Sequence, residues 1–159
     1  MDSSIICGVD GSDESQAALA VAARLADRLR ARLVLAHVVE YAHAPYAVVG
    51  PMGAGAVPRS LVAATTNDQV QAAERLLAKI AEEAGLERAE RRVAFGLAAE
   101  RLADLADDEE AELIVVGARG RGVFKAAFLG SVSMSLIGVA RCPVLVVPAG
   151  AGGTTRRGS

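Results

Sequence analysis

Hydrophobic residues gather in continuous runs along this chain rather than in alternating patterns. The four strongest runs cover residues 5–9, 33–39, 113–116 and 144–147, and a weaker run covers 91–95. Continuous apolar runs of this length are typical of strands that are covered on both faces, as in a parallel sheet enclosed by helices. The pattern therefore predicts five strands, most of them fully buried.

The segments between these runs have the periodicity of helices. Ser12 is placed to cap a helix whose first turn is acidic and whose last turn is basic, which suits the helix dipole. Further helices are predicted over about 67–84, where Gly85 ends the helix, over about 98–108 and over about 131–140. Strands that alternate with helices predict an α/β fold, an open, doubly wound parallel five-stranded sheet of flavodoxin-like architecture with strand order 3-2-1-4-5.

Two segments fall outside this alternation. Residues 41–65 contain Pro45, Pro51 and Pro58, and they are expected to form a long loop that is either mobile or functional. Residues 149–159 form a tail rich in Gly, Thr and Arg with nothing to bury, so disorder is expected there. The chain is therefore expected to form a single domain over 1–148.

Composition excludes several classes of function. The 17 basic and 19 acidic side chains nearly balance, whereas a nucleic-acid-binding protein usually has a strong basic excess. No apolar run approaches the roughly 20 residues that a membrane span needs, and the first residues lack the pattern of a secretory signal. We therefore expect a cytoplasmic protein with neither nucleic acid nor membrane as a partner.

The two cysteines, Cys7 and Cys142, are interpreted as small buried hydrophobic residues, because two cysteines in this chain make no zinc-binding pattern. In the predicted strand order, the fourth strand separates the first from the last. Two strand spacings place Cys7 and Cys142 about 10 Å apart, which is beyond the reach of a disulfide.

The strongest candidate for a binding site is the stretch 117–133, which leaves the fourth strand at its carboxyl end and enters a helix at Ser131. Its glycines let the backbone approach a ligand closely, and residues 130–133 present free N–H groups at a helix N-terminus, where phosphate binds well. The hydroxyls of Ser131 and Ser133 can add hydrogen bonds. Three basic side chains place positive charge in the same stretch: Arg119, Arg121 and Lys125.

A flexible glycine-rich loop followed by an ordinary serine N-cap would explain the same residues, and this alternative stays open here. The stretch is not a P-loop, because no Gly-Lys-Ser/Thr follows. It does not fit the dinucleotide-binding fingerprint either, because Lys125 stands where the third glycine is required and the helix begins too late.

A second candidate element is the segment 8–12, directly after the first strand. In a doubly wound sheet the ligand crevice lies where two neighbouring strands send their connections to opposite faces. If the first and fourth strands are those neighbours, Asp10 lies across the crevice from Gly117. Asp10 can then accept a hydrogen bond from a ribose hydroxyl or hold a metal-bound water, or it can simply stabilise the turn.

Three separated segments resemble the universal stress protein family. The pattern Gly117-x2-Gly120-x9-Gly130-Ser131 matches the spacing G-x2-G-x9-G-[S/T] of its ATP-binding members. The opening Val9-Asp10-Gly11-Ser12 and the closing Ala140-Arg141-Cys142-Pro143 before the last strand are also similar to that family. The resemblance covers about residues 3–148. One departure lies at Gly96-Leu97-Ala98, where many relatives have a proline shortly after the glycine.

The resemblance implies an ATP-binding stress-response or regulatory protein that forms a homodimer through its last strand, residues 144–147. It also implies which residues hold the nucleotide. These are Gly8, Val9 and Asp10 after the first strand, Val38 along the adenine, Val116, Gly117, Arg119 and Gly120 near the ribose and phosphates, and Gly130, Ser131, Val132 and Ser133 around the phosphates.

We expect Mg²⁺ to accompany ATP, because the charge of a triphosphate exceeds what three basic side chains neutralise. No base is placed against a nucleophile, so no catalytic residue and no protein-bound metal are predicted, and ATP hydrolysis is slow if it occurs. A side chain at Gly130 is expected either to force the turn out of its conformation or to occupy the space of a phosphate oxygen.

Two other functions remain as alternatives. The first is a dimeric interaction module without nucleotide. The second is an enzyme like the ATP pyrophosphatases, although residues 10–15 match their Ser-Gly-Gly-x-Asp-Ser loop poorly. His37, His43 and the acidic run 107–110 are interpreted as ordinary polar positions.

Overall fold

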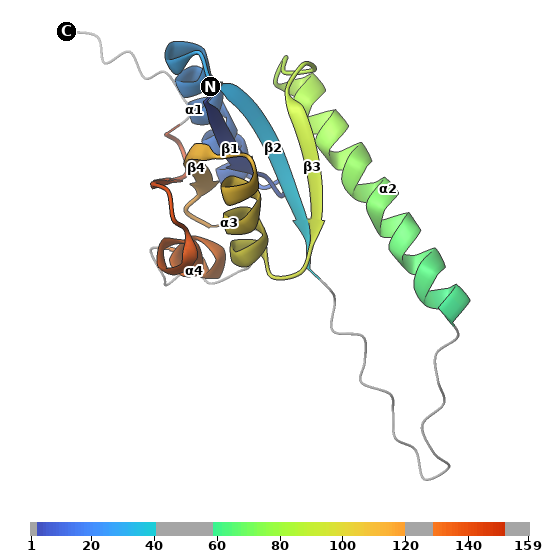
Figure 1. The fold of residues 1–159 in the computed structure, drawn as a ribbon. Coiled ribbons are helices and arrows are strands. Elements are labelled where there is room, and N and C mark those ends of the chain that lie inside the picture. Colours follow the sequence, from blue (N-terminus) through green and yellow to red (C-terminus); the bar gives the residue numbers. More distant parts are fainter. Residues whose placement is uncertain (1–2, 41–58, 120–128, 152–159) are drawn as a thin grey trace, which may run out of the picture.

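The computed structural model describes residues 3–40, 59–119 and 129–151 (Figure 1). Strands and helices alternate along them in the predicted order. The strands are β1 (Ser4–Gly8), β2 (Arg32–Val39), β3 (Glu90–Phe95), β4 (Ala111–Gly117) and β5 (Val144–Val147), and the helices are α1 (Asp13–Leu29), α2 (Arg59–Glu83), α3 (Ala98–Asp108) and α4 (Ser131–Val139).

The five strands form one parallel sheet in the order β3-β2-β1-β4-β5, so the predicted fold class and strand order are confirmed. β1 is the central strand. Its Ile5 pairs with Leu33 of β2 on one side and with Leu113 of β4 on the other. Because all strands run in one direction, their carboxyl ends share one edge of the sheet, which lies at the bottom of Figure 1.

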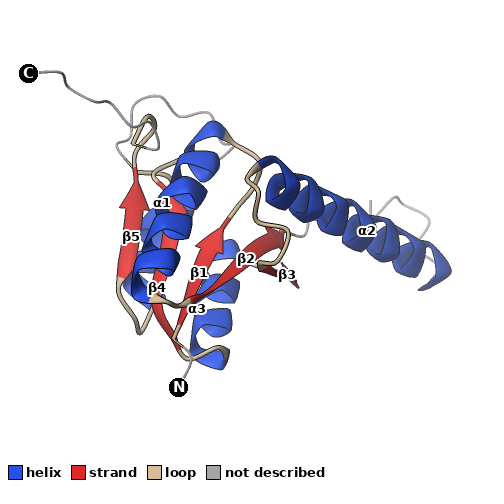
Figure 2. Ribbon diagram, turned by 90° about the horizontal axis from the view of Figure 1, so that it is seen from above, coloured by secondary structure: helices blue, strands red, loops and turns tan. Residues whose placement is uncertain are grey.

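Helices cover both faces of the sheet (Figure 2). On one face, Leu35 of β2 and Leu77 of α2 are buried in a core that α1 also lines. On the other face, Leu102 of α3 and Leu136 of α4 are buried in a second core. Residues 4–7 of β1 are completely buried because both cores enclose them. This double coverage explains why the strand sequences are continuously apolar.

Helix α1 begins and ends at the predicted signals. The Ser12 hydroxyl accepts a hydrogen bond from the backbone N–H of Ser15 at 3.2 Å, and Asp13 and Glu14 occupy the first turn. The helix ends at Leu29, and the next residue, Arg30, has a left-handed φ of 55° that reverses the chain toward β2.

Helix α2 is longer than predicted. It begins at Arg59, whereas the sequence pattern placed its start near residue 67 and a loop over 41–65. The physical reason is that residues 59–66, which follow Pro58, contain neither Gly nor Pro, so nothing stops the helix from extending back toward Pro58. The remainder of that predicted loop, 41–58, lies outside the described residues.

The chain continues past β5 as a turn. The backbone N–H of Ala151 donates to the carbonyl of Pro148 at 3.2 Å, and Gly150 between them has a φ of 83°. The first three residues of the predicted disordered tail, 149–151, are therefore described as a turn, and the others, 152–159, lie outside the described residues.

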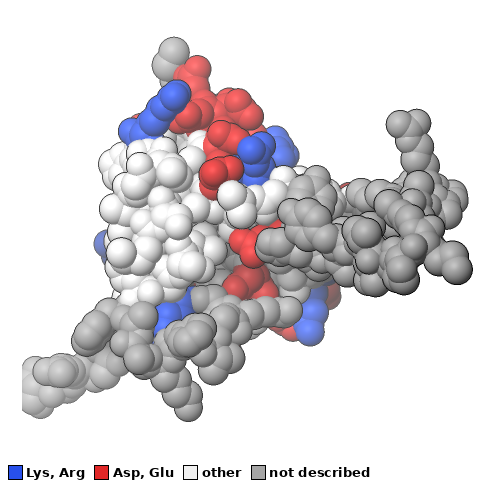
Figure 3. All heavy atoms as spheres, turned by 90° about the horizontal axis from the view of Figure 1, so that it is seen from below, with Lys and Arg blue, Asp and Glu red and all other residues white. Residues whose placement is uncertain are grey.

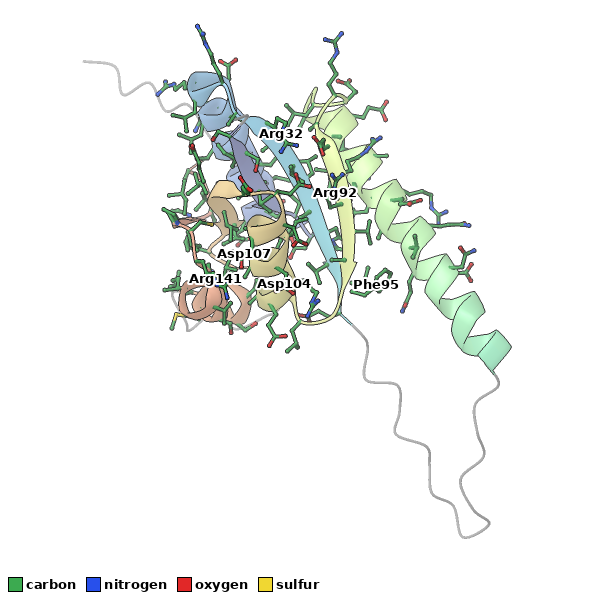
Figure 4. All side chains as sticks on the ribbon, in the orientation of Figure 1. Arg32, Arg92, Phe95, Asp104, Asp107 and Arg141 are labelled. Atoms are coloured by element: carbon green, nitrogen blue, oxygen red, sulfur yellow. The ribbon has the colours of Figure 1, made fainter. Side chains whose placement is uncertain are left out.

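Four charged side chains form a network at the amino edge of the sheet. Arg32 contacts Glu90 at 2.7 Å and Glu109 at 3.2 Å, and Arg92 contacts the same two carboxylates at 2.9 and 3.0 Å. Figure 4 shows the two arginines at the starts of β2 and β3. Because Glu109 follows α3, the network joins the end of that helix to two strands. The hydrogen bond from Arg32 holds the pKa of Glu90 below its ordinary value.

Replacing Glu90 by Gln tests this network through its pH dependence. A carboxyl whose folded pKa is depressed contributes stability above its unfolded pKa, and this contribution is lost as pH falls through the folded pKa. We expect Glu90→Gln to lower the melting temperature at pH 7, and the difference from wild type to shrink below about pH 4. Thermal unfolding followed by circular dichroism measures both. The matched control is Glu83→Gln, whose carboxylate makes an exposed contact of 3.8 Å with Lys79. An equal, pH-independent loss in both variants would contradict the role of the network.

Both cysteines are free, as predicted. Cys7 is completely buried in β1, and burial raises the pKa of its thiol to about 12. Cys142 lies before the edge strand β5 and is only partly buried, so its interpretation as a buried residue was wrong. Partial burial, followed by the charge of Asp107, raises the pKa of its thiol as well.

We expect a thiol reagent at pH 8 to modify Cys142 alone in the folded protein, and both thiols after denaturation without reductant. Cys7 does not react in the folded state because it is neither accessible nor ionised at that pH. Mass spectrometry of the labelled protein identifies the modified residue. Rapid labelling of Cys7 in the folded protein would mean that β1 is not enclosed as described.

Candidate functional site

The carboxyl ends of β1, β2 and β4 meet at a small cavity of about 100 Å³. Its lining residues come from these strands and from the starts of α1, α3 and α4: Gly8, Val9, Asp10, Ser15, Val38, Ala98, Val116, Gly117, Arg119 and Val132. β1 and β4 are neighbours whose following helices, α1 and α4, lie on opposite faces, so the cavity sits at the switch point of the sheet.

Eight of the twelve predicted binding residues line this cavity, so the structure brings the distant segments together. Gly130 and Ser131 lie at the start of α4, beside the lining residue Val132. Ser133 is buried below that turn, with 2% of its surface exposed. Gly120 lies outside the described residues, as do Arg121 and Lys125.

Sequence reasoning did not propose Ser15 and Ala98 as binding residues. Ser15 lies three residues after the helix cap Ser12. A polar residue at this spacing often contacts the cap, so the sequence did contain a signal that Ser15 faces the end of β1. Ala98 carries no polar group. It lines the cavity only because α3 starts at the carboxyl edge of the sheet, which no local pattern reveals.

The turn after β1 is held by its own side chains. One carboxylate oxygen of Asp10 accepts from the backbone N–H of Ser12 at 2.9 Å and from the Ser12 hydroxyl at 2.6 Å. The Ser15 hydroxyl donates to the carbonyl of Ser12 at 2.9 Å. Asp10 therefore stabilises the turn, which was one of the two roles that the sequence left open. It also lines the cavity.

Two glycines of the cavity are required by packing. A Cβ at Gly117 would lie 2.8 Å from the backbone carbonyl carbon of Glu14, so the first turn of α1 packs directly on the end of β4. A Cβ at Gly8 would lie 3.0 Å from the side chain of Leu102 in α3. The absence of side chains thus brings two helices close to the strand ends that form the cavity.

The start of α4 is tied to the end of β4 through Ala118. The backbone N–H of Gly130 donates to the Ala118 carbonyl at 2.6 Å, and the Ser133 hydroxyl lies 3.1 Å from the same oxygen and 3.0 Å from the Gly130 carbonyl. The Ser133 hydroxyl is therefore used within the turn. Gly130 has φ −76° and ψ 169°, a conformation open to any residue, so the expectation that a side chain would distort the turn was wrong and only the argument from space remains.

Two helices begin at this cavity without a side-chain cap. Neither Leu97 before α3 nor Gly130 before α4 offers a side-chain acceptor to the first N–H groups. At α3, the N–H of Ala98 makes a long contact of 3.4 Å with the carboxylate of Glu40. Helix N-termini carry partial positive charge and open donors, so both ends favour an anion in the cavity.

Arg119 adds a buried donor to the same place. Its Nε is buried and has no hydrogen-bond partner in the described part of the structure. A buried N–H of a cation that lacks an acceptor is costly, and most such groups in folded proteins are paired. Arg119 also lines the cavity, so it brings a positive charge to the place where the two helices begin.

His37 has a structural contact near the site. Its Nδ1 lies 2.8 Å from the carbonyl of Val9 and donates to it, which joins β2 to the end of β1. This agrees with its interpretation as an ordinary polar position, while His43 lies outside the described residues. Within residues 3–40, 59–119 and 129–151, no group of His, Cys, Asp and Glu side chains is arranged to hold a metal ion.

Comparison with known proteins shows the family of this chain. The family model described as the universal stress protein family matches residues 1–148. The chain belongs to the universal stress protein family. It is 34% identical over 147 residues to a universal stress protein of Thermus aquaticus, which covers 92% of this chain and 99% of that protein. It is also 32% identical over 149 residues to the universal stress protein YxiE of Bacillus subtilis, with the same coverages.

Solved structures of universal stress proteins share the fold. The protein UspA of Lactobacillus plantarum superposes with a TM-score of 0.67 at 22% identity, over 91% of this chain and 97% of that one. A universal stress protein solved in complex with cAMP is 26% identical, with a TM-score of 0.62 over 93% of this chain and 98% of that one. In the part of the chain that the structure describes, no helix has the length and apolar character needed to cross a membrane.

Replacing Gly117 by Ala tests the packing of α1 on β4. The added methyl group would overlap backbone atoms of Glu14, which cannot rotate away, so we expect a loss of about 1–3 kcal/mol of unfolding free energy. The control is Gly138→Ala in α4, where a Cβ meets nothing within 4 Å and higher helix propensity favours a gain of up to about 1 kcal/mol. Urea denaturation measures both changes. Equal stability of Gly117→Ala and wild type would show that the contact with α1 is looser than described.

Proposed function

We propose that this universal stress protein binds ATP at the cavity and acts as a nucleotide-dependent regulatory protein in the form of a homodimer. The observation that carries the proposal is that two helix N-termini and a cationic side chain meet at one place. The residues before α3 and α4 provide no side-chain cap, and Arg119 lines the same cavity. Phosphate groups are the common ligands that accept from helix N-termini and from arginine together.

The two sides of the cavity suit the two ends of a nucleotide. Val9 and Val38 form an apolar side, against which the adenine would lie, and Arg119 with the start of α4 forms the side for phosphates. The described residues enclose about 100 Å³, below the range of roughly 300–1,000 Å³ for small-molecule pockets. Part of a nucleotide would therefore extend beyond them. Mg²⁺ would be held mainly by the phosphates, because the described residues offer no ligand cluster of their own.

The hydroxyls around the cavity favour binding over catalysis. Ser15 donates to the carbonyl of Ser12, and the Ser133 hydroxyl lies against two backbone carbonyls. A catalytic serine needs a general base as its partner, and these hydroxyls have backbone oxygens instead. The proposed activity is therefore a change between nucleotide-bound states, with slow hydrolysis at most.

Monophosphate nucleotides are the second candidate class. One solved universal stress protein is in complex with cAMP, and that of Archaeoglobus fulgidus is in complex with dAMP. ATP is favoured here because the G-x2-G-x9-G-[S/T] spacing of ATP-binding members is complete in this chain. The preference for ATP over a monophosphate nucleotide depends on how much of the binding free energy comes from the phosphate side of the cavity.

Calorimetric titration of the full chain with ATP, AMP and cAMP in the presence of Mg²⁺ tests the proposal. We expect ATP to bind most tightly and Arg119→Met to weaken it by at least about tenfold, or about 1.4 kcal/mol. The matched control is Arg24→Met, which removes the same charge from the exposed face of α1 and should bind like wild type.

Other results would each contradict part of the proposal. Equal affinity for ATP and AMP would show that the phosphate side contributes little. Loss of ATP binding in both arginine variants would mean that the net charge of the protein, and not the position of Arg119, determines the affinity. Absence of binding by the folded wild type to all three nucleotides would favour the interaction module without nucleotide.

A further inference from the structure

A groove of about 880 Å³ lies between helix α2 and the edge strand β3. Figures 1 and 2 show α2 beside β3, with the first turns of the helix extending past the edge of the sheet. The volume lies within the roughly 300–1,000 Å³ that binding sites for organic ligands have. Among the described residues, none lines both this groove and the nucleotide cavity, so the groove is a separate surface.

The groove follows the outer edge of β3. Consecutive side chains of a strand point to opposite faces, so Arg91 and Arg92 lie on opposite faces of the sheet, and both line the groove. Val93 shares the face of Arg91 and packs in the core that contains Leu77 of α2. The groove therefore extends from the face under α2 around the strand. β3 is the last strand of the sheet, and no described strand pairs with its outer edge.

Apolar side chains form the floor of the groove. Val70 and Leu77 of α2 line it together with Val93 and Phe95 of β3. Figure 4 shows Phe95 at the carboxyl end of β3, on the side of α2. Because Val93 and Phe95 are two residues apart, they lie on one face of the strand. An extended segment beside β3 would thus meet two apolar side chains in succession.

Arginines give the groove a positive charge. Arg75, Arg91 and Arg92 line it, and Glu74 is the one acid among its described lining residues. Arg92 belongs to the charged network at the amino edge of the sheet. The side chains of Arg75 and Arg91 form no ion pair within residues 3–40, 59–119 and 129–151. Both guanidinium groups are therefore available to the carboxylates of a ligand.

Charge separates the groove from the apolar surface of α4. Figure 3 shows a broad area without charged side chains on the side of the molecule where α4 lies, and a surface without charge gives no basis for choosing one occupant. The groove selects its occupant in three ways. The edge of β3 offers backbone donors and acceptors, the floor takes apolar side chains, and Arg75 and Arg91 take carboxylates. An extended acidic peptide supplies partners for all three.

We propose that the groove binds an extended acidic segment of another protein, which pairs with β3 as a sixth strand. Neighbouring strands place the side chains of one face next to each other. The segment therefore carries an acidic residue beside Arg91 and apolar residues beside Val93 and Phe95, with one residue between successive positions. Arg75 adds its charge from α2. β3 of a second copy does not supply this pattern, because its charged residues are two arginines and one glutamate.

Fluorescence anisotropy of the full chain without nucleotide, titrated against a labelled peptide at up to about 1 mM, tests the proposal. The peptide Glu-Thr-Val-Thr-Val-Thr-Glu reads the same in both directions, so it presents the required pattern whether it pairs parallel or antiparallel. We expect saturable binding that Arg91→Gln weakens at least about tenfold, because a charge-assisted hydrogen bond is lost. The matched control is Arg88→Gln, since Arg88 is exposed in the turn before β3 and does not line the groove. It should bind like wild type.

Two altered peptides separate the contributions of charge and backbone. Lysine in place of both glutamates should abolish binding, because the peptide then meets Arg75 and Arg91 with like charge. Methylation of all the peptide nitrogens keeps the side chains but removes the backbone donors, and it should abolish binding as well. Decanoate, a small anion with an apolar chain, is the calorimetric probe for a small-molecule site at the same place.

The other results would each overturn the proposal or a defined part of it. Absence of peptide binding by the folded wild type overturns it, and saturable binding of decanoate alone would make the groove a small-molecule site. Equal binding of the methylated peptide would exclude strand pairing. Equal affinities of wild type and Arg91→Gln, or equal losses in Arg91→Gln and Arg88→Gln, would exclude recognition by position. Circular dichroism confirms folding, and Arg75→Gln replaces Arg91→Gln if that variant unfolds.

Discussion

Complete burial of β1 between two layers of helices is the constraint on which the other features of this structure depend. Residues 4–7 have no exposed surface, because α1 covers one face of the strand and α3 covers the other. A strand in that position must have neighbours on both edges, and here they are β2 and β4. This arrangement forces the ends of β1 and β4 together and sends their helices to opposite faces, which creates the cavity.

The cavity and the packing use the same atoms. Gly117 lacks a side chain because the backbone of Glu14 lies against it, and that contact brings the start of α1 to the end of β4. Asp10 likewise accepts a hydrogen bond within its own turn, and the Ser133 hydroxyl contacts the carbonyls of Gly130 and Ala118. Residues that a binding motif suggests as ligand contacts thus serve first to shape the site. The groups that remain to favour an anion in the cavity are the starts of α3 and α4 and the positive charge of Arg119.

The cavity is joined to the edge strand through one buried residue. The carbonyl of Ala118 accepts a hydrogen bond from Gly130 at the start of α4, and its N–H donates to Val147 at the end of β5. The position of α4 relative to the cavity and the position of the edge strand therefore depend on the same peptide groups.

The amino-acid sequence alone determined the order of elements, the parallel sheet and two of the segments that line the cavity. Continuous apolar runs encode strands covered on both faces, and the cap at Ser12 encodes the start of α1, because both signals are local and repeat at short range. The start of α2 at Arg59 escaped prediction, since a helix without a clear cap has no local boundary signal. Only the tertiary structure decided that Ala98 lines the cavity, that Gly117 serves the packing of α1 and that Ala118 joins three elements. Each of these depends on contacts between residues far apart in the chain, and such contacts leave no periodic pattern in the sequence.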